Sequence, residues 1–154
     1  MAQSTRTESP VPLVGGSGGG AIPLPTVAAR HDYARQAYRI LQAAFVLVPI
    51  VVGADKFFDD LVNWEMYLAP AIPAHLHVAA GTLMRAAGVM EISVGIIVAT
   101  WPRIGAYIVT AWLWSVIVNL LMIPGFYDVA LRDFGLSLGA LALARLSEQF
   151  NVRT

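Results

Sequence analysis

The chain has 154 residues, the usual size of one domain, and 57% of them are apolar whereas only 13% are charged. Soluble proteins carry roughly 25% charged residues, so this chain has too few charges to cover a water-exposed surface. The mean hydropathy is +0.65. This composition predicts an integral membrane protein, with lipid as its first partner, and excludes an intrinsically disordered chain.

Charge and cysteine content exclude further classes of protein. Ten basic and ten acidic residues give a net charge of zero, so we expect no nucleic-acid partner. The chain has no cysteine. This excludes disulfides, thiolate metal sites and iron–sulfur clusters. Any redox role would therefore depend on a bound cofactor, and we expect none that is attached covalently.

The first 30 residues are rich in glycine and proline and contain no uninterrupted apolar segment of the kind found in signal peptides. This composition predicts a flexible cytoplasmic tail over residues 1–30. The membrane domain is expected to cover residues 31–150. Residues 151–154 would then form a short C-terminal tail.

Four apolar stretches follow the predicted tail, at residues 38–58, 76–101, 104–123 and 129–146. Each is near the ~20 residues that cross a ~30 Å hydrocarbon layer as a helix. Between the first two stretches, Trp64 and Tyr67 stand among acidic residues and prolines, which is typical of a short interfacial helix. The predicted fold class is an all-α membrane protein, a four-transmembrane-helix bundle with a short interfacial helix between helices 1 and 2.

Basic residues predict the orientation of this bundle. With the N-terminus in the cytoplasm, seven arginines lie in or beside the cytoplasmic ends of the spans, and only Lys56 and Arg132 lie at the other ends. Basic residues are enriched in cytoplasmic loops. We therefore expect both the N-terminus and the C-terminus in the cytoplasm.

Two charges lie inside the second stretch, Arg85 and Glu91, where each costs about 2.5 to 3.5 kcal/mol on insertion scales. At a helical rotation of about 100° per residue, both share one face with Gly81, Gly88 and Gly95. Glycines at this spacing let another helix approach closely. We therefore expect Arg85 and Glu91 at a seam between helices, with partners on other helices.

The other stretches offer such partners, towards the outer half of the bundle. The candidate ligand-binding or polar-network residues are Asp55, Lys56, Arg85, Glu91, Asn119, Arg132 and Asp133. In the fourth stretch, a GxxxG pair also predicts close helix packing. The candidate packing glycines are Gly81, Gly88, Gly95, Gly135 and Gly139. No catalytic residue is predicted.

Three interpretations of the interior charges stay open. They can form an ion-paired network that fixes helix register. They can instead line a ligand pocket in the outer half of the bundle, because ionisable residues inside a membrane are functional candidates by default. A partner-protein interface is the third possibility, and the glycine seams would serve equally within one bundle or between copies in a homo-oligomer.

Histidines do not indicate a metal or haem site. His75 and His77 form an H-x-H sequence, but two ligands without a third are too few for a metal centre. The only other histidine is His31, far along the chain on the cytoplasmic flank, which does not suit a bis-histidine haem. We predict neither metal nor haem.

Three segments resemble the DoxX family of small four-helix bacterial membrane proteins. They are GADKFF at 53–58, GVMEISVG at 88–95 and LRDFGL at 131–136. Family members carry G-x-x-K near the end of the first helix, G-x-x-E-I-x-x-G in the second and R-D before the last. The resemblance covers about residues 35–147 and singles out Lys56, Glu91, Arg132 and Asp133.

The resemblance implies a bacterial inner-membrane location and a quinone-linked or redox-complex-associated role, because relatives include the DoxD-type subunit of a thiosulfate:quinone oxidoreductase. It implies a quinone as the ligand and an oxidoreductase as the partner, so the chain would be an accessory subunit rather than a free-standing enzyme. Arg85 or Lys56 would then hydrogen-bond a quinone carbonyl, and Glu91 or Asp133 would accept a proton. The alternative is a non-enzymatic small-solute transporter or membrane organiser whose interior charges form a structural ion-pair network.

Overall fold

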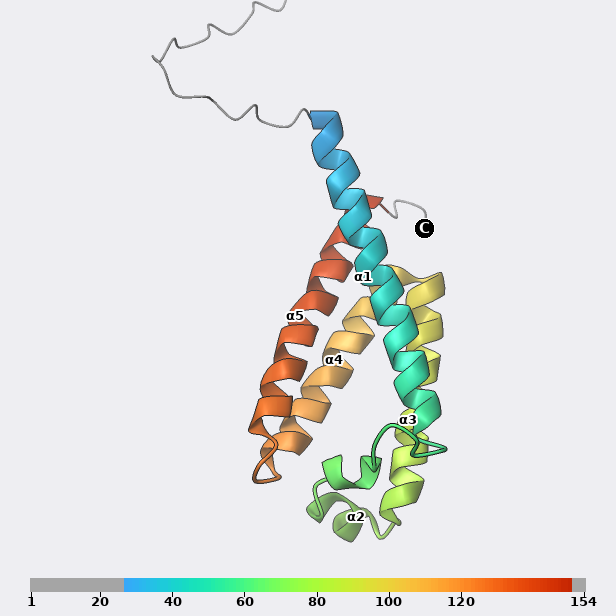
Figure 1. Ribbon diagram of the computed structural model, residues 1–154, viewed down its shortest axis with the longest axis vertical. Coiled ribbons are helices and arrows are strands. Elements are labelled where there is room, and N and C mark those ends of the chain that lie inside the picture. The colour runs from blue at the N-terminus through green and yellow to red at the C-terminus, as the bar shows by residue number, and fades with distance from the viewer. Residues whose placement is uncertain (1–26, 151–154) are drawn as a thin grey trace, which may run out of the picture.

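The computed structural model describes residues 27–150, with side-chain surroundings from residue 31 onward. These residues form an all-helical fold, as predicted. Its elements are α1 (Val27–Asp55), the 3-10 helix η1 (Trp64–Tyr67), α2 (Ala71–Leu76), α3 (Ala80–Thr100), α4 (Pro102–Leu121) and α5 (Tyr127–Phe150). Figure 1 shows the long helices side by side, with η1 and α2 lying across one end of the bundle.

Three helices of the described chain are long and apolar enough to cross a membrane. They are the His31–Asp55 part of α1, α3 and α4. Large apolar side chains such as Leu47, Ile96 and Val118 are exposed on their outer faces, as expected for helices surrounded by lipid. The prediction of a membrane protein is confirmed at this level. Helix α5 has 24 residues but carries Arg132 and Asp133 in its second turn. It is not among the helices whose hydropathy and low charge content suit a membrane span.

Helix boundaries differ from the predicted stretches by several residues, and two of the differences have a clear cause in the sequence. Residues 27–30, which the sequence assigns to the tail, belong to α1, because alanine and arginine favour a helix. The single interfacial helix is replaced by η1 and the six-residue α2, since Pro70 cannot continue η1 but suits the start of a new helix. The remaining parts of the predicted tails, residues 1–26 and 151–154, lie outside the described residues.

Close approach of α1 to α3 depends on glycines. A Cβ atom built on Gly88 would lie 2.6 Å from the carbonyl oxygen of Gly53, and one built on Gly95 would lie 2.7 Å from the side chain of Ile50. Any side chain there would push the helices apart. The close approach expected at Gly88 and Gly95 is therefore present. Gly81 faces the carboxylate of Glu65 in η1 instead of a long helix.

Helices α1 and α5 meet only at one end of the bundle. The ring of Tyr38 lies 5.7 Å from that of Phe150, and Phe45 lies beside Gly139. The core at this end consists of Phe45, Val94, Val98, Ala106, Val109, Ala140, Leu143 and Ala144. From there α1 and α5 diverge towards η1, as Figure 1 shows. Helix α4 packs along α5, and α3 packs along α1. Because each pair moves apart together with α1 and α5, the divergence leaves room inside the bundle.

Candidate functional site

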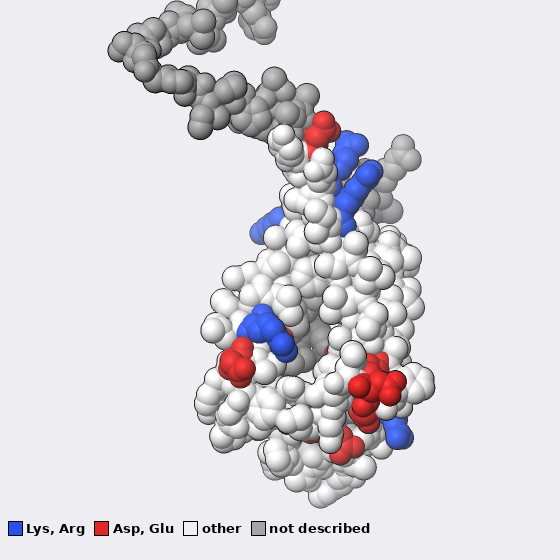
Figure 2. Space-filling model, in the orientation of Figure 1, with Lys and Arg blue, Asp and Glu red and all other residues white. Residues whose placement is uncertain are grey.

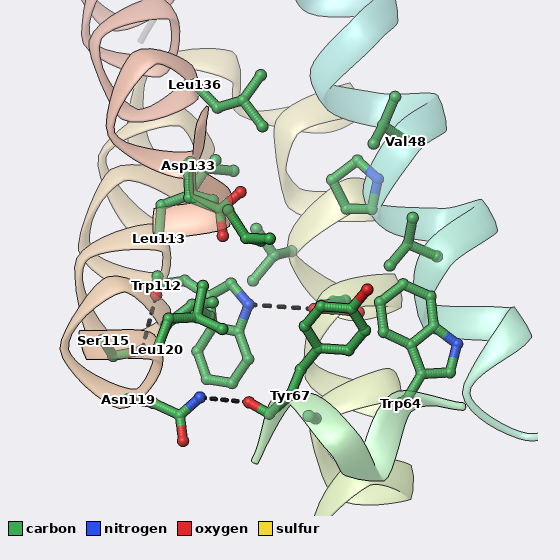
Figure 3. Close-up of a pocket in the computed structure, with 18 of the residues that line it drawn as sticks. Val48, Trp64, Tyr67, Trp112, Leu113, Ser115, Asn119, Leu120, Asp133 and Leu136 are labelled. Atoms are coloured by element: carbon green, nitrogen blue, oxygen red, sulfur yellow. Dashed lines mark hydrogen bonds between the residues drawn. The ribbon is translucent and has the colours of Figure 1, made fainter. Parts of the chain in front are cut away.

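A cavity of about 910 Å³ lies where the helices diverge. Its wall is formed by α1, α3, α4 and α5, with η1 across its end (Figure 3). Most of the lining side chains are aliphatic or aromatic, whereas the charged and amide groups gather towards η1. Cavities of roughly 300 to 1,000 Å³ with apolar walls and a few polar groups are typical of small-molecule sites.

Several of the predicted polar residues meet in this wall, although they come from distant parts of the chain. They are Lys56, which directly follows α1, Glu91 of α3, Asn119 of α4, and Arg132 and Asp133 of α5. Asp55 lies next to the cavity without lining it, and Arg85 lies outside it. The wall includes all four charged residues to which the DoxX resemblance points, Lys56, Glu91, Arg132 and Asp133.

An ion pair between Lys56 and Glu91 forms the polar centre of the wall. The Lys56 Nζ atom lies 2.7 Å from Glu91 Oε2, and the two side chains are only 6% and 13% exposed. The indole N–H of Trp112 donates to Glu91 Oε1 at 3.4 Å, and this bond is the dashed line that starts at the indole nitrogen of Trp112 in Figure 3. These contacts join α1, α3 and α4. Because each charge compensates the other, neither side chain is buried with an unpaired charge, which would cost stability.

Trp64 covers the ammonium group of Lys56. Its ring centroid lies 3.8 Å from Lys56 Nζ, a cation–π contact. The indole N–H of Trp64 donates to Asp55 Oδ2 at 2.6 Å, and Asp55 Oδ1 also accepts from the backbone N–H of Leu61 at 3.0 Å. Asp55 therefore holds the segment after α1 and orients Trp64 over the ion pair.

Asn119 fastens the segment between η1 and α2 across the end of the cavity. Its Nδ2 donates to the carbonyl oxygen of Tyr67 at 2.6 Å, and its Oδ1 accepts from the N–H of Ala69 at 2.8 Å. The ring of Tyr67 packs edge-on against Phe126, with centroids 5.0 Å apart. The amide of Asn119 thus hydrogen-bonds backbone groups of another segment, and these bonds close the cavity at this end.

Replacing Asn119 with alanine is expected to loosen this closure. The backbone groups of Tyr67 and Ala69 lose their partners, which costs about 1 to 2 kcal/mol. Hydrogen exchange at the Ala69 amide should accelerate while exchange in α3 stays unchanged. Ser115→Ala is the control, because this exposed hydroxyl contacts only its own helix. Unchanged protection of Ala69 in Asn119→Ala would contradict the role of the amide.

Arg132 and Asp133 stand on the α5 side of the cavity. Asp133 is buried, whereas the side chain of Arg132 is 69% exposed and its Nε lies 3.9 Å from Asp133 Oδ1. The sequence places Arg132 in a close-packed seam with Gly135 and Gly139. This expectation is wrong at Gly135, where an added Cβ meets nothing within 4 Å, because α1 has already diverged from α5 at this level. Gly139 makes an ordinary contact with Phe45.

Arg85 does not belong to the interior network. It is exposed and makes no side-chain hydrogen bond or ion pair within residues 31–150. The predicted interior position is therefore wrong. One turn further along α3, Gly88 already faces Gly53 in the last turn of α1 and Lys56 directly after it. Because α1 ends at Asp55, none of the described helices covers Arg85, whose side chain also leans towards the start of its own helix.

Aromatic residues complete the site and were not among the predicted site residues. Trp64, Tyr67 and Trp112 all line the cavity (Figure 3). The one signal in the sequence is the seven-residue spacing of Trp112 and Asn119, which puts both on one face of a helix. Residues 31–150 contain no group of three or more His, Asp or Glu side chains arranged to hold a metal ion.

The fold and the cavity define a class of protein: the described residues form helices, three of them long and apolar enough to cross a membrane, around an apolar cavity with a largely buried ion pair in its wall. Comparisons with protein-family models, with curated proteins and with solved structures found no match to this chain.

Proposed function

We propose that this chain is a DoxX-type protein of the bacterial inner membrane that binds a quinone or quinol in the cavity and works as an accessory subunit of an oxidoreductase. The observation that carries the proposal is the apolar cavity of about 910 Å³ with the Lys56–Glu91 pair and Trp112 in its wall. A quinone has a flat apolar ring and carbonyl acceptors. The ammonium group of Lys56 has further N–H groups besides the one directed at Glu91 and can donate to a carbonyl, and Glu91 or Asp133 offers a carboxylate to accept a proton.

In this proposal α5 is a fourth membrane span. Its 24 residues reach about 36 Å at 1.5 Å per residue, enough to cross the hydrocarbon layer. Its buried charge, Asp133, lines the cavity, and charges inside spans are expected to face a bundle interior. Helix α5 also packs along α4, which is one of the three helices long and apolar enough to cross a membrane.

The cytoplasmic side is proposed to be the end at which α1 begins. Arg35 and Arg39 lie in the first half of α1, Arg103 at the start of α4 and Arg145 near the end of α5. Figure 2 shows several basic side chains gathered at this end together with an acidic one, whereas acidic side chains are more numerous towards the η1 end, where basic ones also lie. This distribution supports the orientation expected from the sequence, with both ends of the chain in the cytoplasm.

An accessory role follows from what the chain can supply. Quinone chemistry couples electrons to protons, and the chain has carboxylates for protons but no cysteine for thiol chemistry or for an iron–sulfur cluster. Electrons would therefore come from a partner protein. The partner's class is an oxidoreductase with its own redox centre.

The test is purification from the native host in mild detergent, with mass spectrometry of bound lipids and co-purifying proteins. Gly135→Phe places a ring in the open part of the cavity wall, where an added Cβ meets nothing. Ala142→Phe, on an exposed position of α5 outside the wall, is the matched control. We expect quinone and an oxidoreductase with the parent chain and the control, and about tenfold less quinone with Gly135→Phe.

A second candidate is a solute transporter or membrane organiser in which the ion pair is purely structural. It is favoured by the closed pairing of Lys56 with Glu91 and by the finding that no buried side-chain nitrogen or oxygen of the described residues lacks a hydrogen-bond partner. Recovery of the parent chain alone, with ordinary lipids and no quinone, would reject the first proposal in favour of this one.

A further inference from the structure

The cavity reaches the molecular surface between α1 and α5. Most of the exposed residues in its wall lie on these two helices, namely Ala44, Val48, Arg132, Gly135 and Leu136, and the others are Leu61 and Ser115. The two helices touch at Phe45 and Gly139 and then separate. Figure 2 shows the resulting hollow on this face. We name the gap between Val48 and Leu136, seen at the upper edge of Figure 3, the α1–α5 opening.

The α1–α5 opening has apolar sides. Val48 is 55% exposed and Leu136 is 43% exposed, although both also line the cavity. Val48 lies within the His31–Asp55 segment that is apolar enough to cross a membrane. The opening therefore faces the hydrocarbon layer rather than water. A molecule dissolved in the bilayer can enter between these apolar side chains, while the exposed Arg132 lies one turn away on α5.

The charges in the cavity wall cancel. Lys56 and Arg132 are matched by Glu91 and Asp133, and the only other polar side chains in the wall are uncharged. A ligand head with a net charge would leave that charge uncompensated in an apolar site, which is unfavourable. The wall therefore favours a head that is uncharged and carries hydrogen-bond acceptors.

We infer that the cavity is loaded sideways from the bilayer through the α1–α5 opening, and that its ligand is a long-tailed, uncharged amphiphile. The head lies beside Lys56, Glu91 and Trp112, and the tail lies between Val48 and Leu136. This inference rests on the proposed function and adds to it the path of the ligand and the requirement for a tail. A tail in the opening contacts apolar side chains on both helices, so it contributes to binding.

The test narrows the opening and measures how fast a tailed quinone binds. Val48→Phe/Leu136→Phe is compared with Val51→Phe/Leu138→Phe, whose original side chains are 55% and 51% exposed but lie outside the cavity wall. Each variant is placed in lipid nanodiscs. The probes are a dimethoxy-methyl-benzoquinone with a decyl tail and the same head without a tail.

Binding is followed by quenching of tryptophan fluorescence. Trp64 and Trp112 line the cavity, and the other two tryptophans, Trp101 and Trp114, are replaced by phenylalanine in all variants. We expect the narrowed variant to bind the tailed probe about tenfold more slowly than the control variant. The tail-less probe should bind weakly to all variants, with rates that differ by less than about twofold.

Each other outcome overturns a defined part of the inference. Equal association rates for the tailed probe would overturn side loading while quinone binding itself stands. Equal affinity of the two probes would overturn the tail's place in the opening. Displacement of the tailed probe by decanoate or decyltrimethylammonium at similar concentrations would overturn the uncharged head. Absence of quenching in the parent chain would reject the inference together with the proposed function.

Discussion

Glu91→Leu is expected to lower the free energy of unfolding by about 3 to 5 kcal/mol, because it leaves the ammonium group of Lys56 buried without its carboxylate. The indole N–H of Trp112 loses its acceptor at the same time. Equilibrium unfolding in mixed detergent–SDS micelles measures the change. Arg85→Leu is the control from the same helix, and it should stay within about 0.5 kcal/mol of the parent because Arg85 is exposed.

The double variant Lys56→Met/Glu91→Leu separates the pair from its individual charges. Removing both partners leaves no buried charge, so most of the lost stability should return. A double-mutant cycle then gives the coupling between Lys56 and Glu91. Equal losses in Glu91→Leu and Arg85→Leu, or purely additive losses in the double variant, would show that the 2.7 Å ion pair does not hold α1 against α3.

The contrast between Glu91 and Arg85 also shows what helical periodicity can and cannot predict about the burial of a residue. Both residues lie on the glycine-rich face of α3, and the sequence predicts the interior for both. Periodicity defines a face along a whole helix, but the neighbouring helix decides how much of that face is covered. Because α1 ends at Asp55, its last turns cover Gly88 and Glu91 and leave Arg85 exposed.

The polar part of the cavity was more predictable than its apolar part. Charged groups inside apolar stretches are costly, and this cost pointed to Glu91, with Lys56 and Asp133 among its candidate partners, but it pointed equally to Arg85, which is exposed. Val48 and Leu136 carry no such signal, because a side chain that borders a cavity has the same chemistry as one that faces lipid. Their role depends on the divergence of α1 and α5, which follows from packing between residues far apart in the chain.

Asn119 shows a second limit of the sequence. Its position in an apolar stretch predicts an interior hydrogen bond, and the structure contains two. Their partners, the backbone groups of Tyr67 and Ala69, lie about fifty residues earlier in a segment without regular periodicity. Any residue has such backbone groups, so no side-chain pattern identifies these partners, and the amide closes the cavity instead of facing a ligand.

Gly88→Ala and Gly135→Ala are expected to change stability in opposite directions, although both add one methyl group to a long helix. At Gly88 the new Cβ would lie 2.6 Å from the carbonyl oxygen of Gly53 and 3.1 Å from Lys56 Cβ. A backbone oxygen cannot move aside alone, so α1 must shift away from α3, and we expect a loss of about 2 to 3 kcal/mol. The shift also disturbs the Lys56–Glu91 pair.

At Gly135 the new Cβ meets nothing within 4 Å, so only the backbone preference changes. Alanine is favoured over glycine inside a helix by about 0.5 to 1 kcal/mol, and Gly135→Ala should stabilise the fold by up to this amount. The same SDS unfolding series compares the two variants. If both destabilise equally, α5 must be closely packed at Gly135, which would remove the open wall needed for side loading. If Gly88→Ala is neutral, α1 and α3 are further apart than the glycine contact requires, because a methyl group fits only where the two backbones are separated.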